Sequence, residues 1–290
     1  MDWNWLQLPR EQVFLKKEWQ EEFNEKGYII LDGLSKEDLQ ETKKATYQLL
    51  GDIKKKAPKR YFPVGQLMDF DLRNRSTMII DSILPEILKR HFDIHKIDFY
   101  SGTHLIKPRG RRSFLSTHQD SALVDETKYH SILLWCPLQH TNFINGRLFV
   151  LEGSHRLGNI HRSTTIPWAF KAAEPVIYQH SKPVSVKAGQ VCYFHSGLIH
   201  HSGYNWVQPY RIALSSLITS KGAPLINCYQ DDDTPKGKVE IYEADMEFFH
   251  NHDFNKRPEG YQQVGIVDQR FPAISNSELA SLISSRKKPA

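Results

Sequence analysis

Cysteine is scarce in this chain, and long apolar runs are absent. The three cysteines, Cys136, Cys192 and Cys228, form no CxxC pair and cannot all be joined within one chain, which favours a reducing compartment. No stretch approaches the roughly 18 apolar residues of a membrane helix. The N-terminal MDWNWLQLPREQ lacks the basic and apolar regions of a secretory signal. We therefore expect a cytoplasmic protein with no membrane partner.

A large excess of basic or acidic residues is also lacking. The chain has 38 basic and 33 acidic residues, a net charge of +5, and no long basic stripe interleaved with aromatic residues. A nucleic-acid surface would require such a stripe. We therefore expect no nucleic-acid partner and favour a small-molecule substrate. The composition leaves the oligomeric state open.

The first third of the chain has helical character. A helix is predicted over 11–26, where Gly27 ends it, and a short apolar strand over Tyr28–Leu31. Ser35 begins a second helix, with Asp38 at capping-box spacing; that helix ends near Gly51. A third helix is predicted over Ser82–Arg90.

From about residue 97, short segments rich in β-branched and aromatic residues alternate with turn residues. The predicted strands are 98–106, 130–138, 147–152, 184–188, 190–195 and 211–219. This succession predicts a mainly β fold with flanking helices, a barrel or double-sheet jelly roll. We expect a single domain over 1–290, made of a helical part (1–96), a jelly-roll core (97–220) and a C-terminal extension (221–290). The extension has a solvated loop at 231–238, then a helix at EADMEFFHNH and a terminal helix over 276–284.

The segment STHQDSALV places His118 and Asp120 two residues apart. On a strand these side chains share one face, so they can converge on one metal ion. The motif alone is weak, because His91-Phe92-Asp93 repeats it and the chain has 14 histidines. A hydrogen-bonded or ion-paired His–Asp couple is the alternative.

The downstream segment FHSGLIHHSGYNWVQPYRIALSS adds His200 and Arg211. Two histidines and one carboxylate form the facial triad of non-haem Fe(II) oxygenases, which keeps coordination positions open. A closed structural zinc site would need four ligands, usually with thiolates. Neighbouring strand residues face opposite sides, so only one of His200 and His201 can reach the metal. The spacing to Arg211 favours His200.

Arg211 suits the far carboxylate of 2-oxoglutarate, because guanidinium offers a planar pair of donors. Ser202 shares the strand face of His200 and can donate a hydroxyl to the same carboxylate. A salt bridge at the rim of the barrel is the alternative for Arg211.

Over residues 98–216 the chain resembles the phytanoyl-CoA dioxygenase family of 2-oxoglutarate oxygenases. The matching elements are HLIKP (104–108), the THQD block, Trp135, NGRLFVLEGSHR (145–156) and FHSGLIHHSGYN…R (194–211). The resemblance implies a double-stranded β-helix of the cupin-like jelly-roll type. It also implies Fe(II) at His118, Asp120 and His200, and 2-oxoglutarate at Arg211, Ser202, Thr103 and Trp135. The family usually has a small residue where this chain has His201, and 221–290 matches no family pattern.

The activity that the resemblance implies is a dioxygenase that consumes 2-oxoglutarate and O2 and releases succinate and CO2. Family members that halogenate carry a small residue in place of the metal-binding carboxylate, so Asp120 favours hydroxylation of an unactivated C–H bond. The substrate is then a small metabolite or natural-product intermediate. Desaturation, cyclisation and epoxidation stay open, because they use the same oxidant.

The basic segment 107–112 is compatible with an anionic substrate, and a solvated loop is the alternative. Two other classes of protein compete with the oxygenase. A metal-dependent hydrolase would use the same three ligands but has no need of Arg211. A non-catalytic jelly-roll binding protein would keep the fold without turnover.

Overall fold

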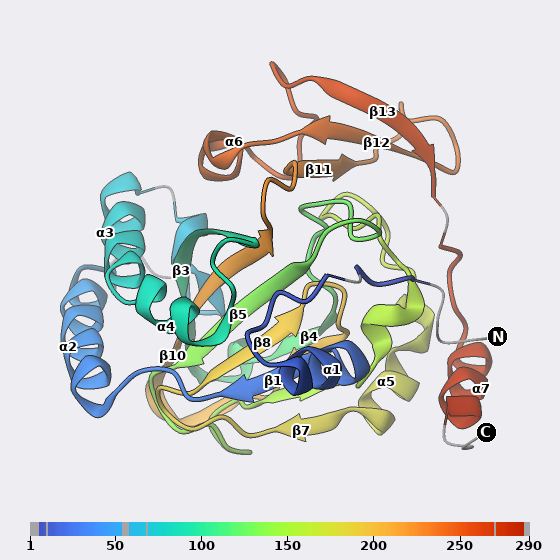
Figure 1. Cartoon of the computed structure of the whole chain (residues 1–290). Helices are drawn as coiled ribbons and strands as arrows, with labels where there is room; N and C mark the ends of the chain where they lie inside the picture. The colour runs from blue at the N-terminus through green and yellow to red at the C-terminus, as the bar shows by residue number, and fades with distance from the viewer. Residues whose placement is uncertain (1–5, 10, 54–57, 68, 270, 287–290) are drawn as a thin grey trace.

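A six-stranded antiparallel sheet forms the centre of the molecule (Figure 1). The computed structural model describes residues 6–9, 11–53, 58–67, 69–269 and 271–286. The strand order is β1-β8-β5-β10-β3-β2. These strands are β1 (Tyr28–Leu31), β2 (Phe62–Pro63), β3 (Ile97–Gly110), β5 (Ser131–Pro137), β8 (Val191–His195) and β10 (Asn205–Ser220).

A four-stranded antiparallel sheet, in the order β4-β9-β6-β7, packs against the first sheet. Its strands are β4 (Leu115–His118), β6 (Leu148–Val150), β7 (Lys182–Val184) and β9 (His200–Ser202). Trp135, Phe194 and Ala213 of the large sheet share one buried cluster with Leu148 and Val150 of the small sheet. Two facing antiparallel sheets with one apolar filling form a jelly roll, which confirms the predicted fold class.

Helices cover the other face of the large sheet. They are α1 (Lys17–Lys26), α2 (Lys36–Ile53), α3 (Phe70–Asp81) and α4 (Leu84–His91). Leu49 and Leu88 of these helices share a buried cluster with Ile106 and Ile212 of the sheet. Side chains alternate along a strand, so the neighbouring residues of Ile106 and Ile212 point into the space between the sheets.

The C-terminal extension forms a third sheet, β11-β12-β13, made of Ile226–Tyr229, Lys238–Glu243 and Gln263–Asp268. It lies beyond one end of the two-sheet core, with α6 (Met246–Asn251) beside it (Figure 1). The terminal helix α7 (Asn276–Arg286) instead packs on α5 (Glu174–His180) through Ile177 and Leu279. Four short 3-10 helices complete the described elements: Val64–Gln66, Arg111–Ser113, Ser154–Leu157 and Lys171–Ala173.

Most predicted elements occur, with shifted ends. Tyr28–Leu31 is a strand as predicted, Gly27 ends α1 in the left-handed region at φ 84°, and the Asp38 amide donates to the Ser35 hydroxyl at 3.0 Å. The first helix starts at Lys17, not near residue 11, and the strand predicted at 184–188 lies at Lys182–Val184 instead. Helices α3 and α5 and the sheet β11–β13 were not predicted.

Two structural observations bear on the expected absence of a membrane partner and on the expected reducing compartment. In the described ranges, no helix combines the length and the apolar character that a membrane crossing requires. All three cysteines are buried and unpaired.

Candidate metal centre

Two neighbouring strands of the small sheet bring the His118, Asp120 and His200 side chains together. His118 ends β4 and lies directly opposite His200, the first residue of β9. The Nε2 atom of His118 lies 3.9 Å from Asp120 Oδ1, and Nε2 of His200 lies 3.7 Å from Asp120 Oδ2. One nitrogen or oxygen atom from each side chain fits within a span of 4.8 Å. A single ion can therefore contact all three.

Both histidine rings are oriented by backbone carbonyls. Nδ1 of His118 donates to the Ser116 carbonyl at 2.8 Å, and Nδ1 of His200 donates to the Leu198 carbonyl at 2.9 Å. This fixes the tautomer that leaves each Nε2 lone pair free for a metal. Burial, and then the neighbouring His200, lowers the pKa of His118 to about 4. The ring is therefore neutral at pH 7, as metal binding requires.

The Asp120 backbone is held on both sides, while one oxygen of its carboxylate has no hydrogen-bond partner. Its amide donates to the Ser196 carbonyl at 3.0 Å, and its carbonyl accepts from Nε of Arg162 at 2.8 Å. Its Oδ2 atom is buried and has no hydrogen-bond partner. A buried carboxylate oxygen without a partner is unfavourable unless a cation or donor meets it. The donor set and this orphan oxygen fit a divalent metal ion.

Arg211 lies on the inner face of β10, opposite Lys107 of β3. Its guanidinium carbon lies 5.2 Å from the centre of the Trp135 ring, and its Nε and Nη1 are buried without an acceptor. Burial lowers its pKa to about 10, so it stays cationic at pH 7. The Ser202 hydroxyl is likewise buried without a partner. This set of unused donors fits a carboxylate.

Sequence reasoning missed Tyr61, which lies near Arg211. It considered Lys107 only as part of the basic segment 107–112, whereas the structure places Lys107 on β3 opposite Arg211. Lys107 is fully buried, and its Nζ donates to the carbonyls of Ser113 and, at 3.0 Å, Gly203. Burial, and then Arg211, lowers the Lys107 pKa to about 6. Tyr61 lies with its ring centre 5.4 Å from Lys107 Nζ. The HLIKP motif of the family contains Lys107 and so indicated this residue from the sequence, whereas Tyr61 lies in a distant segment outside the matching motifs.

Thr103 lies apart from this group. Its hydroxyl accepts from the Gly65 amide at 2.8 Å. It lines a cavity of about 560 Å³ beside Leu133 and Leu217, while His118 and Asp120 line a different cavity. The structure therefore does not bring Thr103 into the cavity that His118 and Asp120 line.

Three other histidines, His91, His195 and His201, lie outside the metal centre. His91 ends α4, and its Nδ1 lies 2.8 Å from the Tyr193 hydroxyl on the helix-covered face of the large sheet. Nδ1 of His195 accepts from the Gly197 amide at 2.9 Å. The His201 ring stacks on Phe149 at 4.8 Å. None of them joins the three candidate ligands among the described residues.

The cavity above His118 and Asp120 has a volume of about 870 Å³. Arg60, Arg112 and Arg162 are among its lining residues, and Asp120 is the one acidic residue among those described there. Residues 161–168 form one side, which we call the cavity wall. The remaining lining residues are amides, hydroxyls, apolar and aromatic groups: Tyr61, Pro63, Gln66, Phe114, Leu115, Gln119, Ser121 and Asn159.

Comparison with solved structures shows likenesses of fold. The epimerase SnoN, in complex with Fe3+, alpha ketoglutarate and nogalamycin RO, is 16% identical at a TM-score of 0.54, over 88% of this chain and 97% of that one. HygX from Streptomyces hygroscopicus, with nickel and 2-oxoglutarate bound, is 14% identical at a TM-score of 0.52, over 72% and 88%. The carbocyclase SnoK from nogalamycin biosynthesis is 18% identical at a TM-score of 0.50, over 73% and 86%.

No curated protein matches the chain significantly. The model of the family described as phytanoyl-CoA dioxygenase (PhyH) matches residues 23–213, which is more than half of the chain and contains all three candidate ligands and Arg211. The chain therefore belongs to the phytanoyl-CoA dioxygenase family.

Proposed function

We propose that this chain is a non-haem Fe(II)- and 2-oxoglutarate-dependent dioxygenase in which His118, Asp120 and His200 hold the iron. One observation carries the proposal: one ligand atom from each of the three side chains lies within 4.8 Å of the others, and Oδ2 of Asp120 is buried without a hydrogen-bond partner. Two histidines and one carboxylate leave positions open for a co-substrate. The iron, when bound, supplies the oxidising chemistry together with 2-oxoglutarate and O2.

Arg211 holds the far carboxylate of 2-oxoglutarate in this proposal. Its Nε and Nη1 donors and the Ser202 hydroxyl are buried and unused, so a carboxylate would satisfy them. Trp135 lies against the guanidinium and limits where the co-substrate can lie. A metal-dependent hydrolase would leave these donors without a purpose, which favours the oxygenase.

The proposed outcome is hydroxylation of an unactivated C–H bond in a polar, anionic small molecule. Asp120 retains the third ligand position, which in halogenating relatives is left open. Arg60, Arg112 and several hydroxyl groups line the cavity, and Asp120 is the one acidic residue among the described lining residues. Arg162 of the wall is already paired with Glu126, so Arg60 and Arg112 are the arginines that favour an anion. Desaturation, cyclisation and epoxidation are the alternatives at the same site.

A screen of anionic metabolites under labelled dioxygen tests the proposal. We expect one compound to stimulate succinate release and to gain one labelled oxygen atom, detected by mass spectrometry. A product that loses two hydrogen atoms and gains no oxygen would show that the reaction is desaturation or cyclisation and not hydroxylation. A chain that neither binds 2-oxoglutarate nor releases succinate with any compound would overturn the assignment as an oxygenase.

A further inference from the structure

The C-terminal sheet packs directly on the cavity wall. Ile166 of the wall shares a buried apolar cluster with Cys228 of β11 and Val239 of β12. Ala122, two residues beyond Asp120, belongs to the same cluster. The match to the family ends at residue 213, so this sheet is a feature of the chain outside the matched segment.

Hydrogen bonds join the wall to the extension at two successive residues. The Gln230 amide donates to the Thr165 hydroxyl at 3.1 Å, and the Thr164 hydroxyl donates to the Phe254 carbonyl at 2.7 Å. Both threonines line the cavity. The position of the wall therefore depends on the segments that contain Gln230 and Phe254.

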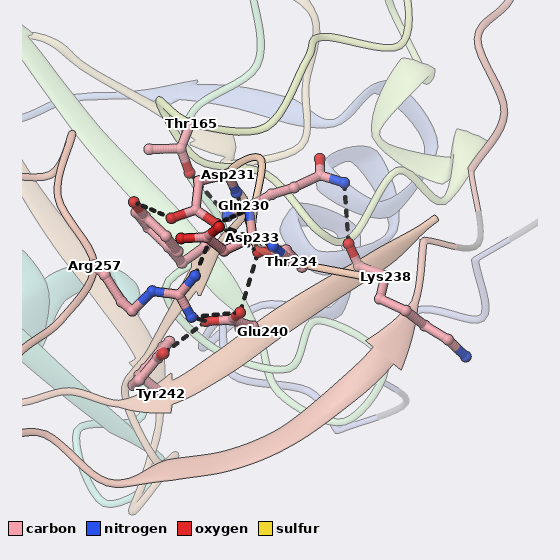
Figure 2. Close-up of polar contacts among 10 residues, drawn as sticks. Thr165, Gln230, Asp231, Asp233, Thr234, Lys238, Glu240, Tyr242 and Arg257 are labelled. Carbon is pink, nitrogen blue, oxygen red and sulfur yellow. Dashed lines mark hydrogen bonds and ion pairs between the residues drawn. The ribbon is translucent and has the colours of Figure 1, made fainter. Parts of the chain in front are cut away.

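Arg257 ties those two segments together (Figure 2). Its Nη1 donates to both Glu240 carboxylate oxygens at 2.6 Å, and its Nη2 donates to Asp231 Oδ1 at 2.7 Å. The Tyr242 hydroxyl donates to Glu240 at 2.6 Å, and the Thr234 hydroxyl donates to it at 3.1 Å. We call these five residues the Arg257 network. It fastens the loop after α6 onto β12 and onto the turn that follows β11.

The wall in turn reaches the metal centre. Arg162 of the wall accepts at its carbonyl from the Ala122 amide at 3.0 Å, and its Nε donates to the Asp120 carbonyl at 2.8 Å. Its guanidinium also forms a buried ion pair with Glu126 at 2.6 Å. Hydrogen bonds and the short chain segments 230–231 and 162–165 therefore connect Arg257 to Asp120.

We propose that Arg257 is a positioning residue, and that through its network the C-terminal sheet fixes the cavity wall and so shapes the substrate site. The inference deepens the proposed function and rests on it for the identity of the cavity. It assigns to 221–290 the task of closing one side of the active site. A loose wall would admit water and uncouple 2-oxoglutarate consumption from substrate oxidation.

The test compares Arg257→Ala with Arg257→Lys and with a matched control, Arg75→Ala. Arg75 is 39% exposed and Arg257 37%, and each pairs with two carboxylates, but Arg75 lies on α3. Hydrogen–deuterium exchange of the full chain with Fe(II) and 2-oxoglutarate under anaerobic conditions should show at least about tenfold faster exchange over 161–168 in Arg257→Ala. Arg257→Lys should restore part of the protection, and Arg75→Ala should match the wild type.

A second readout separates positioning from general stability. We expect substrate-independent succinate release to rise several-fold in Arg257→Ala, while the KM for 2-oxoglutarate stays within twofold of the wild type. Thr165→Val removes a single link between sheet and wall, and should raise exchange over 161–168 without changing it over 231–257. Should Arg257→Ala fail to fold, Thr165→Val tests whether the C-terminal sheet fixes the cavity wall.

Faster exchange confined to 226–268 in Arg257→Ala, with 161–168 unchanged in both variants, would overturn the inference. So would an unchanged succinate rate. The wild-type chain separates failure of this inference from failure of the proposed function. If the wild-type chain forms no complex with Fe(II) and 2-oxoglutarate, the oxygenase assignment fails whatever the exchange pattern of the variants shows.

Discussion

The metal centre and the Arg257 network are both clusters of charged and polar side chains, but they differ in how their polar atoms are satisfied. In the network, both carboxylate oxygens of Glu240 accept hydrogen bonds. At the metal centre, Asp120 Oδ2 and two nitrogens of Arg211 are buried with no partner. Buried polar groups in folded proteins are normally paired, so the unpaired set indicates a ligand-binding site.

This difference predicts opposite responses to mutation. A residue of the Arg257 network contributes to folding, because its removal leaves buried partners unsatisfied. A residue of the metal centre contributes little to folding of the metal-free chain, because it has few partners to lose, and much to ligand binding.

Asp120→Ala should have the largest effect of the changes considered. Loss of one of three ligands should weaken metal binding by at least about 100-fold, since changes one shell further out already cost 10- to 100-fold. Manganese(II) titration followed by electron paramagnetic resonance measures this. The free energy of unfolding of the metal-free chain should stay within about 0.5 kcal/mol of the wild type. A large loss of stability would place Asp120 with the structural groups instead.

Arg211→Met should raise the 2-oxoglutarate concentration needed for half-maximal succinate release by about 10²- to 10³-fold. The carboxylate would lose its charged partner, at a cost of about 3–5 kcal/mol. Met keeps the packing on Trp135 and removes two unpaired donors, so the metal-free chain should unfold at the same denaturant concentration or a higher one. Unchanged co-substrate dependence would remove Arg211 from its proposed role.

Glu240→Gln should lower the free energy of unfolding by about 2 kcal/mol, because hydrogen bonds to a charged group contribute about 1.5–3 kcal/mol. Glu240 is 3% exposed, so little water can replace the lost interactions. Urea unfolding measures the change. The binding of Fe(II) should be unaffected, and a loss of metal affinity comparable to that of Asp120→Ala would erase the contrast between the two clusters.

Lys107→Met should have the smallest effect, which is a change in how the free energy of unfolding depends on pH. Burial, and then Arg211, lowers the Lys107 pKa to about 6, against 10.5 for the unperturbed group. Between these values the unfolded chain binds the extra proton, so this lysine makes the stability of the folded chain rise with pH and fall as pH drops towards 6.

Urea unfolding at pH 7 and pH 8 should therefore show a flatter rise in Lys107→Met than in the wild type. The difference should be about 1 kcal/mol, below the roughly 1.4 kcal/mol per pH unit that a full proton contributes. Equal slopes in the two proteins would show that Lys107 is protonated in the folded state.

The sequence predicted the core of the fold and the three candidate ligands because both depend on short-range patterns. The HxD spacing predicted that His118 and Asp120 lie together, although Asp120 lies two residues beyond the end of β4 and not on the strand. The Ser-Gly turn precedes β9, whose first residue, His200, lies opposite His118. Tyr61 reaches the site through tertiary packing alone, which no local pattern encodes.

Two of the missed elements, α3 and β13, have apolar residues on their exposed side. In α3, Phe70 is 55% and Met78 69% exposed, which obscures the helical period. In β13, Val264 and Ile266 are about half exposed, so its alternation does not mark a buried face. The division of the chain into a helical part, a jelly-roll core and an extension stays a prediction.

Anaerobic titration of the chain with Fe(II) in the presence of 2-oxoglutarate shows whether His118, Asp120 and His200 hold iron. We expect a weak visible charge-transfer band that saturates at one iron per chain, disappears in His118→Ala, Asp120→Ala and His200→Ala, and persists in His91→Ala. No band in the wild-type chain, or an undiminished band in Asp120→Ala, would contradict this expectation.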